Sequence, residues 1–164
     1  MIKDMIKNNR GFTLTEVMVT VLLLGIISTI AIPQYLKTVE KQKAVEALHL
    51  LSAIGRSEER YYVINEVYTE DYSDLDADLV DRSTKTAASG TTFNNSAFRF
   101  VLEGDATPQV TAIRNDAVEP PYCLMRVHET GVVCCESRDE DLCALFGVKE
   151  IGVDDDCEDL KCFP

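Results

Sequence analysis

The sequence has few of the residues and patterns that enzymes and nucleic-acid-binding proteins need. It has only two histidines, His49 and His128. It contains no P-loop, no dinucleotide-binding glycine pattern and no nucleophile elbow. Basic side chains are also few, 16 against 28 acidic ones, which leaves a net charge of −12. These absences argue against an enzyme, against a bound cofactor and against a nucleic-acid partner.

Ionisable side chains are almost absent from residues 12–32. Glu16 is the only one among these 21 residues, of which fourteen are apolar and one is Gly25. A helix of about 17–25 apolar residues is long enough to cross a bilayer. A carboxylate inside such a helix costs about 2.5–3.5 kcal/mol near the bilayer centre and less near an interface. Glu16 therefore predicts a functional partner, and a cut just before Phe12 would create one as a free α-amino group.

The residues before the apolar run form a short polar leader, 1–11, with a net charge of about +2. Gly11 directly precedes Phe12, and the stretch Gly11-Phe12-Thr13-Leu14-Thr15-Glu16-Val17 resembles the processing site of type IV prepilins. That resemblance implies cleavage after Gly11 and N-methylation of Phe12. It also implies that Glu16 acts in assembly, by meeting the Phe12 amino group of another subunit.

The resemblance to type IV pilins implies a location and a set of partners as well. The subunit would wait in the inner membrane and be cut by a prepilin peptidase. An assembly ATPase and a platform protein would then move it, with other pilins, into a homo-oligomeric extracellular pilus (fimbrium). It would be a structural subunit, without enzymatic activity and without a cofactor.

Other interpretations of the anchor and of the whole chain remain open. A secretory signal has a shorter apolar core that ends at a small-residue cleavage site. A plain single-span anchor would explain the length of the run but not Glu16 or the Gly11-Phe12 junction. For the whole chain, the alternatives are a pseudopilin of a type II secretion system and a membrane-tethered periplasmic binding or thiol-redox domain.

Strong helix formers continue the apolar run and predict one helix from about Phe12 to about Asn65. Pro33 cannot donate a backbone hydrogen bond, so it is expected to kink or locally melt this helix, and Gly25 is a second weak point. In the second half, apolar residues at helical spacing form a stripe that is interrupted by Glu58 and is expected to face a packed domain. The stripe consists of Ala44, Ala47, Leu48, Leu51, Ile54, Gly55, Tyr61 and Tyr62.

The remainder of the chain predicts a loop followed by a sheet. Residues 66–95 show no periodicity and predict a long connection, which contains the possible glycosylation sequon Asn94-Asn95-Ser96. Four short strands separated by turns then predict an antiparallel meander, at 98–103, 109–114, 122–127 and 132–135. One face of the meander would pack on the helix stripe, which makes the fold class α+β.

The cysteines are confined to the last 42 residues and predict a disulfide framework around an acidic tail. They are Cys123, Cys134, Cys135, Cys143, Cys157 and Cys162. None forms the C-x2-C pairs that zinc sites use, and six cysteines allow 15 pairings. Two adjacent cysteines in one strand point to opposite faces, so Cys134 and Cys135 are expected to take different partners.

The tail also holds a dense group of carboxylates, for which there are two interpretations. Asp154, Asp156 and Glu158 could bind calcium, which prefers oxygen ligands. They lack the EF-hand pattern, and a solvated acidic surface is the other interpretation.

The predicted organisation is a leader (1–11), a transmembrane and filament-core helix (12–33), an amphipathic helix half (34–65), a loop (66–95), a sheet (96–135) and a Cys-rich acidic region (136–164).

Overall fold

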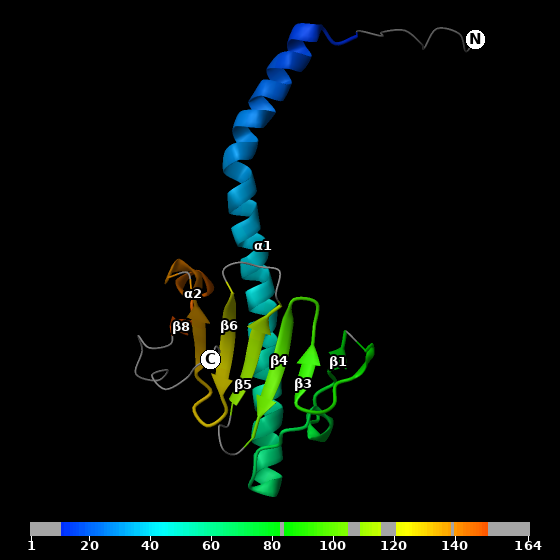
Figure 1. Ribbon diagram of the computed structural model, residues 1–164, viewed down its shortest axis with the longest axis vertical. Coiled ribbons are helices and arrows are strands. Elements are labelled where there is room, and N and C mark those ends of the chain that lie inside the picture. The colour runs from blue at the N-terminus through cyan, green and yellow to red at the C-terminus, as the bar shows by residue number, and fades with distance from the viewer. Residues whose placement is uncertain (1–10, 83, 105–108, 116–120, 139, 151–164) are drawn as a thin grey trace, which may run out of the picture. The chain divides into compact units, whose positions relative to one another are not determined.

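The computed structural model describes residues 11–82, 84–104, 109–115, 121–138 and 140–150, and it has the predicted α+β fold (Figure 1). The chain divides into two compact units, Met1–Glu40 and Lys41–Pro164. The elements are α1 (Leu14–Asn65), η1 (Tyr72–Asp74), β1 (Val80–Asp81), β2 (Thr86–Ala87), β3 (Thr92–Asn94), β4 (Phe98–Glu103), β5 (Gln109–Arg114), β6 (Tyr122–Val127), β7 (Val133–Ser137), α2 (Glu140–Phe146) and β8 (Lys149–Glu150).

The predicted long helix is α1, which has 52 residues and ends at Asn65, the predicted end. It begins at Leu14 because Thr13 caps its N-terminus. Its helical conformation continues through Gly25 and Pro33, so the single subunit shows no local melting at either residue. The predicted kink at Pro33 stays a prediction.

The sheet contains the four predicted strands as a meander but is larger than predicted. Its order is β3-β4-β5-β6-β7-β8, with β4 to β7 antiparallel in sequence order. The additional strands are β3, which pairs antiparallel with β4, and β8, which pairs parallel with β7 after the crossover through α2. A separate two-stranded sheet joins β1 and β2. These extra strands have only two or three residues, too few to show the alternation by which a strand is predicted.

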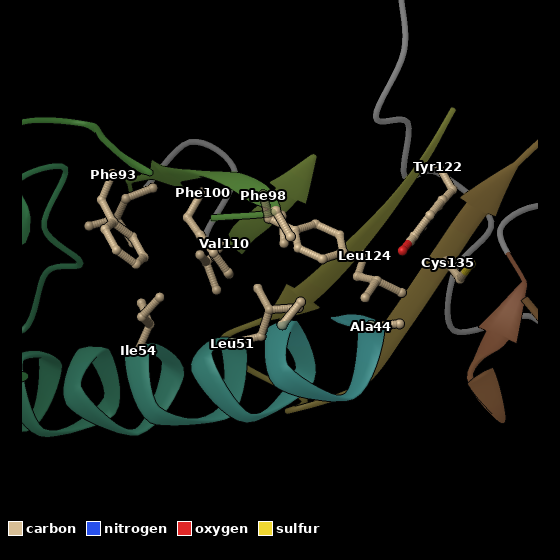
Figure 2. Packing of buried hydrophobic residues seen from close by; sticks show 14 of the residues in the cluster. Ala44, Leu51, Ile54, Phe93, Phe98, Phe100, Val110, Tyr122, Leu124 and Cys135 are labelled. Atoms are coloured by element: carbon tan, nitrogen blue, oxygen red, sulfur yellow. The ribbon is translucent and has the colours of Figure 1, made fainter. Parts of the chain in front are cut away.

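The core lies between the second part of α1 and one face of the sheet. Figure 2 shows Leu51 and Ile54 of α1 pointing toward the sheet, where Phe98 and Phe100 of β4 lie, and these four side chains and that of Ala44 are fully buried. Burial of each large side chain stabilises the fold by about 1.5–3 kcal/mol. The predicted stripe is therefore the packing face of α1 from Ala44 to Gly55, whereas Tyr62 at its end is 43% exposed.

Residues 66–95 are more ordered than the loop that the sequence predicts. Asp71 caps η1 and accepts a hydrogen bond from the Gly90 N–H at 2.7 Å, which closes this segment onto itself. Asp81 accepts hydrogen bonds from the backbone N–H of Asn94 at 2.8 Å and from its side-chain amide at 3.3 Å. Asp71 and Asp81 are therefore internal acceptors that order the predicted connection. The amide of the proposed sequon at Asn94 is already bonded.

Candidate assembly and processing site

The described chain begins without regular structure, from Gly11 to Thr13. Phe12 is 85% exposed, and a Cβ atom added to Gly11 would meet nothing within 4 Å. The fold of the subunit therefore does not require glycine before Phe12. A requirement for glycine at this junction would come from a protein that recognises and cuts it.

Glu16 lies in the first turn of α1, where its carboxylate closes a capping box with Thr13. Its Oε2 atom accepts hydrogen bonds from the Thr13 backbone N–H at 2.8 Å and from the Thr13 hydroxyl at 2.7 Å. The Glu16 N–H donates in return to the Thr13 hydroxyl oxygen at 3.3 Å. This arrangement satisfies donors at the helix start and places a negative charge at the positive end of the helix dipole.

Glu16 therefore has hydrogen-bond partners within its own chain, whereas the sequence predicted only an ionic partner, a free α-amino group. The Thr-x-x-Glu spacing before an apolar run is the signature of a capping box and was the available signal. Thr13 is thus a further residue of the site. Its hydroxyl and N–H hold the Glu16 carboxylate against the start of the helix.

The side chains after Glu16 form an apolar surface around the first part of α1. Large apolar side chains from Leu14 to Leu36 are between 50% and 71% exposed. By its length and composition, α1 could cross a membrane. An apolar surface of this extent is stable in lipid or against other apolar helices, and it is unstable in water.

Two hydroxyl groups inside this apolar segment are satisfied within the helix. Thr20 donates to the carbonyl of Val17 at 2.8 Å, and Thr29 donates to the carbonyl of Ile26 at 2.7 Å. Such hydrogen bonds pair these two donors in an environment without water. The segment is therefore suited to lipid or to a dry helix bundle.

The N-terminal segment is similar to known proteins. Residues 6–32 match the family described as prokaryotic N-terminal methylation motif. Over 62 residues, the chain is 36% identical to the type IV major pilin protein PilA of Myxococcus xanthus. The N-terminal segment of this chain is therefore similar to that of a type IV pilin.

The similarity to that relative covers only part of each protein. It extends over 38% of this chain, which spans about 28% of the length of the relative. No solved structure matches the chain. What the complete protein assembles into, and with which partners, is therefore a matter for proposal.

The four described cysteines of this chain are all in disulfides. Cys135 of β7 is bonded to Cys143 of α2, with 5.7 Å between their Cα atoms. Cys123 and Cys134 are also disulfide-bonded. Because Cys143 is already the partner of Cys135, the adjacent residue Cys134 has a different partner. The Cys135–Cys143 bond fixes α2 to the sheet and so positions the crossover to β8.

A buried acid lies where α1 meets the segment that follows it. Glu58 is fully buried, and its Oε2 accepts a hydrogen bond from the Thr69 N–H at 3.3 Å. Burial raises the pKa of Glu58 to about 7, the Asp74 carboxylate adds to the rise, and the Thr69 hydrogen bond opposes it. Glu58 was expected to interrupt the packing stripe, but it instead continues the buried face of α1.

A buried histidine lies in the turn after β6. His128 is 2% exposed, and its ring stacks on that of Tyr68 with 5.1 Å between centroids. Burial lowers the pKa of His128 to about 4, with the Arg126 charge adding to the decrease and Glu59 opposing it. The side chain is therefore a neutral packing residue at physiological pH. His49, by contrast, is exposed on α1.

The remaining predicted candidates lie in the tail. Cys157, Cys162 and the proposed calcium ligands Asp154, Asp156 and Glu158 lie outside the described residues. Within the ranges that the structure covers, no group of three or more His, Cys, Asp or Glu side chains is placed to hold a metal ion.

Proposed function

We propose that this chain is the structural subunit of a type IV pilus, cut after Gly11 and polymerised through the first part of α1. The observation that carries the proposal is the exposed apolar surface from Leu14 to Leu36, which begins directly after the capped carboxylate of Glu16. In the bilayer this surface contacts lipid. In the fibre it contacts the same surface of neighbouring subunits.

The capping box explains how Glu16 is tolerated before assembly. The hydrogen bonds from Thr13 and the helix dipole stabilise the carboxylate in the single subunit. Cleavage adds a positive charge at the Phe12 amino group. In a fibre, that cation on one subunit and the Glu16 carboxylate on another compensate each other, and the pair fixes the axial register of the helices.

The same proposal assigns the partners and the route of the subunit. A prepilin peptidase cuts and methylates the chain in the inner membrane, and the assembly platform and its ATPase extract it into the extracellular pilus. A type II secretion pseudopilin is the alternative. Disulfides form in the periplasm as well as outside the cell, so the cysteine-rich C-terminal region fits both alternatives.

The test is a Glu16→Ala variant expressed from its own promoter in place of the wild-type chain. Removal of one partner of a buried charge pair destabilises an assembly by about 3–5 kcal/mol. We therefore expect normal membrane insertion and at least a tenfold loss of sheared surface fibres. Glu46→Ala, at an exposed glutamate on the same helix, is the matched control and is expected to assemble normally.

Mass spectrometry of the subunit from wild-type fibres completes the test. The proposal requires an N-terminus at N-methylated Phe12. Fibres that retain residues 1–11, or normal fibre yield from Glu16→Ala, would contradict it. Processed subunits that form no surface fibre, together with a secretion defect on deletion, would identify a pseudopilin instead.

A further inference from the structure

The end of α1 presents an exposed apolar surface on the body of the subunit. Val63 and Ile64 are each 80% exposed, and Tyr62 and Val67 are each 43% exposed. Figure 1 shows the last turns of α1 extending past the ends of the neighbouring strands, so the sheet does not cover them. We call these four residues and Glu66 the helix tip.

Glu66 occupies a position that local stability disfavours for a glutamate. Its φ is +61°, in the left-handed region where glycine or asparagine usually ends a helix. Its carboxylate follows the C-terminus of a 52-residue helix, at the negative end of the dipole, and the last turn contains no basic residue. Both the backbone conformation and the helix dipole make a glutamate unfavourable at position 66 in the single subunit. A cationic partner on another molecule would explain why a glutamate is present there.

Cationic and apolar side chains of the required kind lie elsewhere on α1. Leu36 is 60% exposed, and the side chains of Lys37 and Lys41, one helical turn apart, are exposed on the same part of α1. We call these three residues the collar. They contrast with residues 44–164, which carry 10 basic and 25 acidic side chains. The collar lysines therefore meet the opposite charge on the body of any neighbouring copy.

We propose that the helix tip of one copy docks on the collar of a second copy. Val63, Ile64 and Val67 would cover Leu36, and Glu66 would pair with Lys37 or Lys41. The two surfaces are different parts of the same chain, so the contact is head-to-tail. A head-to-tail contact that does not close into a ring generates an open helical filament.

This inference rests on the proposed function and adds a second contact to it, outside the apolar segment that contains Glu16. The competing role for the collar is to bind anionic lipid headgroups. A membrane surface would satisfy Lys37 and Lys41 but would leave the apolar tip uncovered and Glu66 without a cation. A second copy provides acidic partners for the lysines, an apolar cover for the helix tip and a cation for Glu66. The docking partner is therefore another subunit.

The first experiment exchanges the charges in the full-length chain and measures sheared fibres relative to membrane-inserted subunit. Glu66→Lys alone, and Lys37→Glu with Lys41→Glu, are each expected to lower the fibre yield at least fivefold. The combined triple variant is expected to return it to within twofold of wild type. Lysine suits the helix C-terminus better than glutamate does, so a loss with Glu66→Lys does not come from unfolding. Arg99→Glu, at an exposed residue of β4, is the control for a change in net charge.

The second experiment tests the contact directly by cross-linking. In fibres of a Leu36→Cys, Ile64→Cys variant, a short bis-maleimide should produce a ladder of many subunits, because the contact is head-to-tail. A Leu36→Cys, Val80→Cys variant, with a comparably exposed apolar residue of β1 replaced, should give no ladder.

Three outcomes overturn the docking proposal. Wild-type yields from both charge variants together with no ladder would show that fibres form without this contact, and the proposed function would stand. Loss of membrane retention only in the collar variant, with normal fibres from Glu66→Lys, would assign the collar to the bilayer. If the wild-type chain forms no fibres, the proposed function fails, and the docking proposal fails with it.

Discussion

At the scale of single residues, Glu58 and His128 make stability depend on pH in opposite directions. The pKa of Glu58 is raised to about 7 from 4.5, so between these values the folded state keeps a proton that the unfolded state releases. The contribution of Glu58 to the free energy of unfolding is therefore fully present below pH 4.5 and is lost as pH rises toward 7. The pKa of His128 is lowered to about 4 from 6.5, so stability from His128 is lost as pH falls through that range.

The two effects should be nearly equal and should cancel between pH 4.5 and 6.5, each amounting to about 3 kcal/mol over its full range. We expect the wild-type free energy of unfolding to be almost flat there. His128→Phe keeps the ring stack on Tyr68 and should expose the Glu58 effect, so that stability rises as pH falls from 7 to 4.5. Glu58→Gln should expose the His128 effect and lose stability below pH 6.5. Urea unfolding in mild detergent, followed by near-UV circular dichroism, measures both slopes. Equal slopes in all three proteins would contradict the assignment.

Which single residues could be predicted depended on whether their role is local. Glu16 was predicted as a site residue because it is the one charge in an apolar run, and this stays a prediction. Thr13 could have been added from its spacing to Glu16. Glu58 could not be placed, because its burial depends on Thr69 and on the folding of the segment after α1. A charged residue in an apolar stripe gives no sign of whether tertiary contacts cover it.

At the scale of elements, α1 and the sheet are joined by an arginine that crosses over a glycine. The buried Arg126 of β6 reaches α1, where its Nη2 pairs with Glu59 at 2.7 Å. A Cβ atom at Gly55 would overlap the guanidinium group. Gly55 was predicted as a member of the apolar stripe, but its role is to leave space for this charged group. The sequence does not contain that information, because the two residues are 71 positions apart.

Gly55→Ala should therefore destabilise the fold by about 1–3 kcal/mol, although alanine is the better helix former by about 1 kcal/mol. The cause is displacement of Arg126 from its pair with Glu59. In an Arg126→Met background, Gly55→Ala should be less destabilising by at least about 1 kcal/mol. A double-mutant cycle in urea would measure this difference. The exposed reverse change, Ala53→Gly, controls for helix propensity alone. Additive effects would show that the guanidinium is not what excludes a side chain at residue 55.

Elements with a clear periodicity were predicted well, and short elements were not. Strands β4, β5 and β6 have the predicted bounds, and α1 has the predicted end. The segment before β4 was predicted as a loop because its order comes from side-chain acceptors such as Asp71 and Asp81. Such acceptors act across many positions and have no period. The same applies to β8, which is placed by the crossover through α2.

At the scale of the whole molecule, the two units differ in whether their apolar side chains are buried within the subunit. The buried core cluster is formed by residues from Ala44 onward. The apolar side chains between residues 12 and 36 are exposed, by contrast, and take no part in it. The second unit should therefore not need the first in order to fold. The first needs lipid or other subunits to cover it.

Export of residues 41–164 behind a cleavable signal should therefore yield a folded, monomeric and water-soluble domain. Its disulfides should form fully, since the cysteines all lie within it, and thiol counting under denaturing conditions should detect no reactive thiol. The free energy of unfolding should show the same nearly flat region between pH 4.5 and 6.5 as the full-length chain, because Glu58, His128 and their neighbours are all retained. Size-exclusion chromatography, near-UV circular dichroism and the pH series test these points. A fragment that aggregates, or that folds but loses the flat region, would show that the first part of α1 contributes to the core, and that anchoring and folding are not separate in this chain.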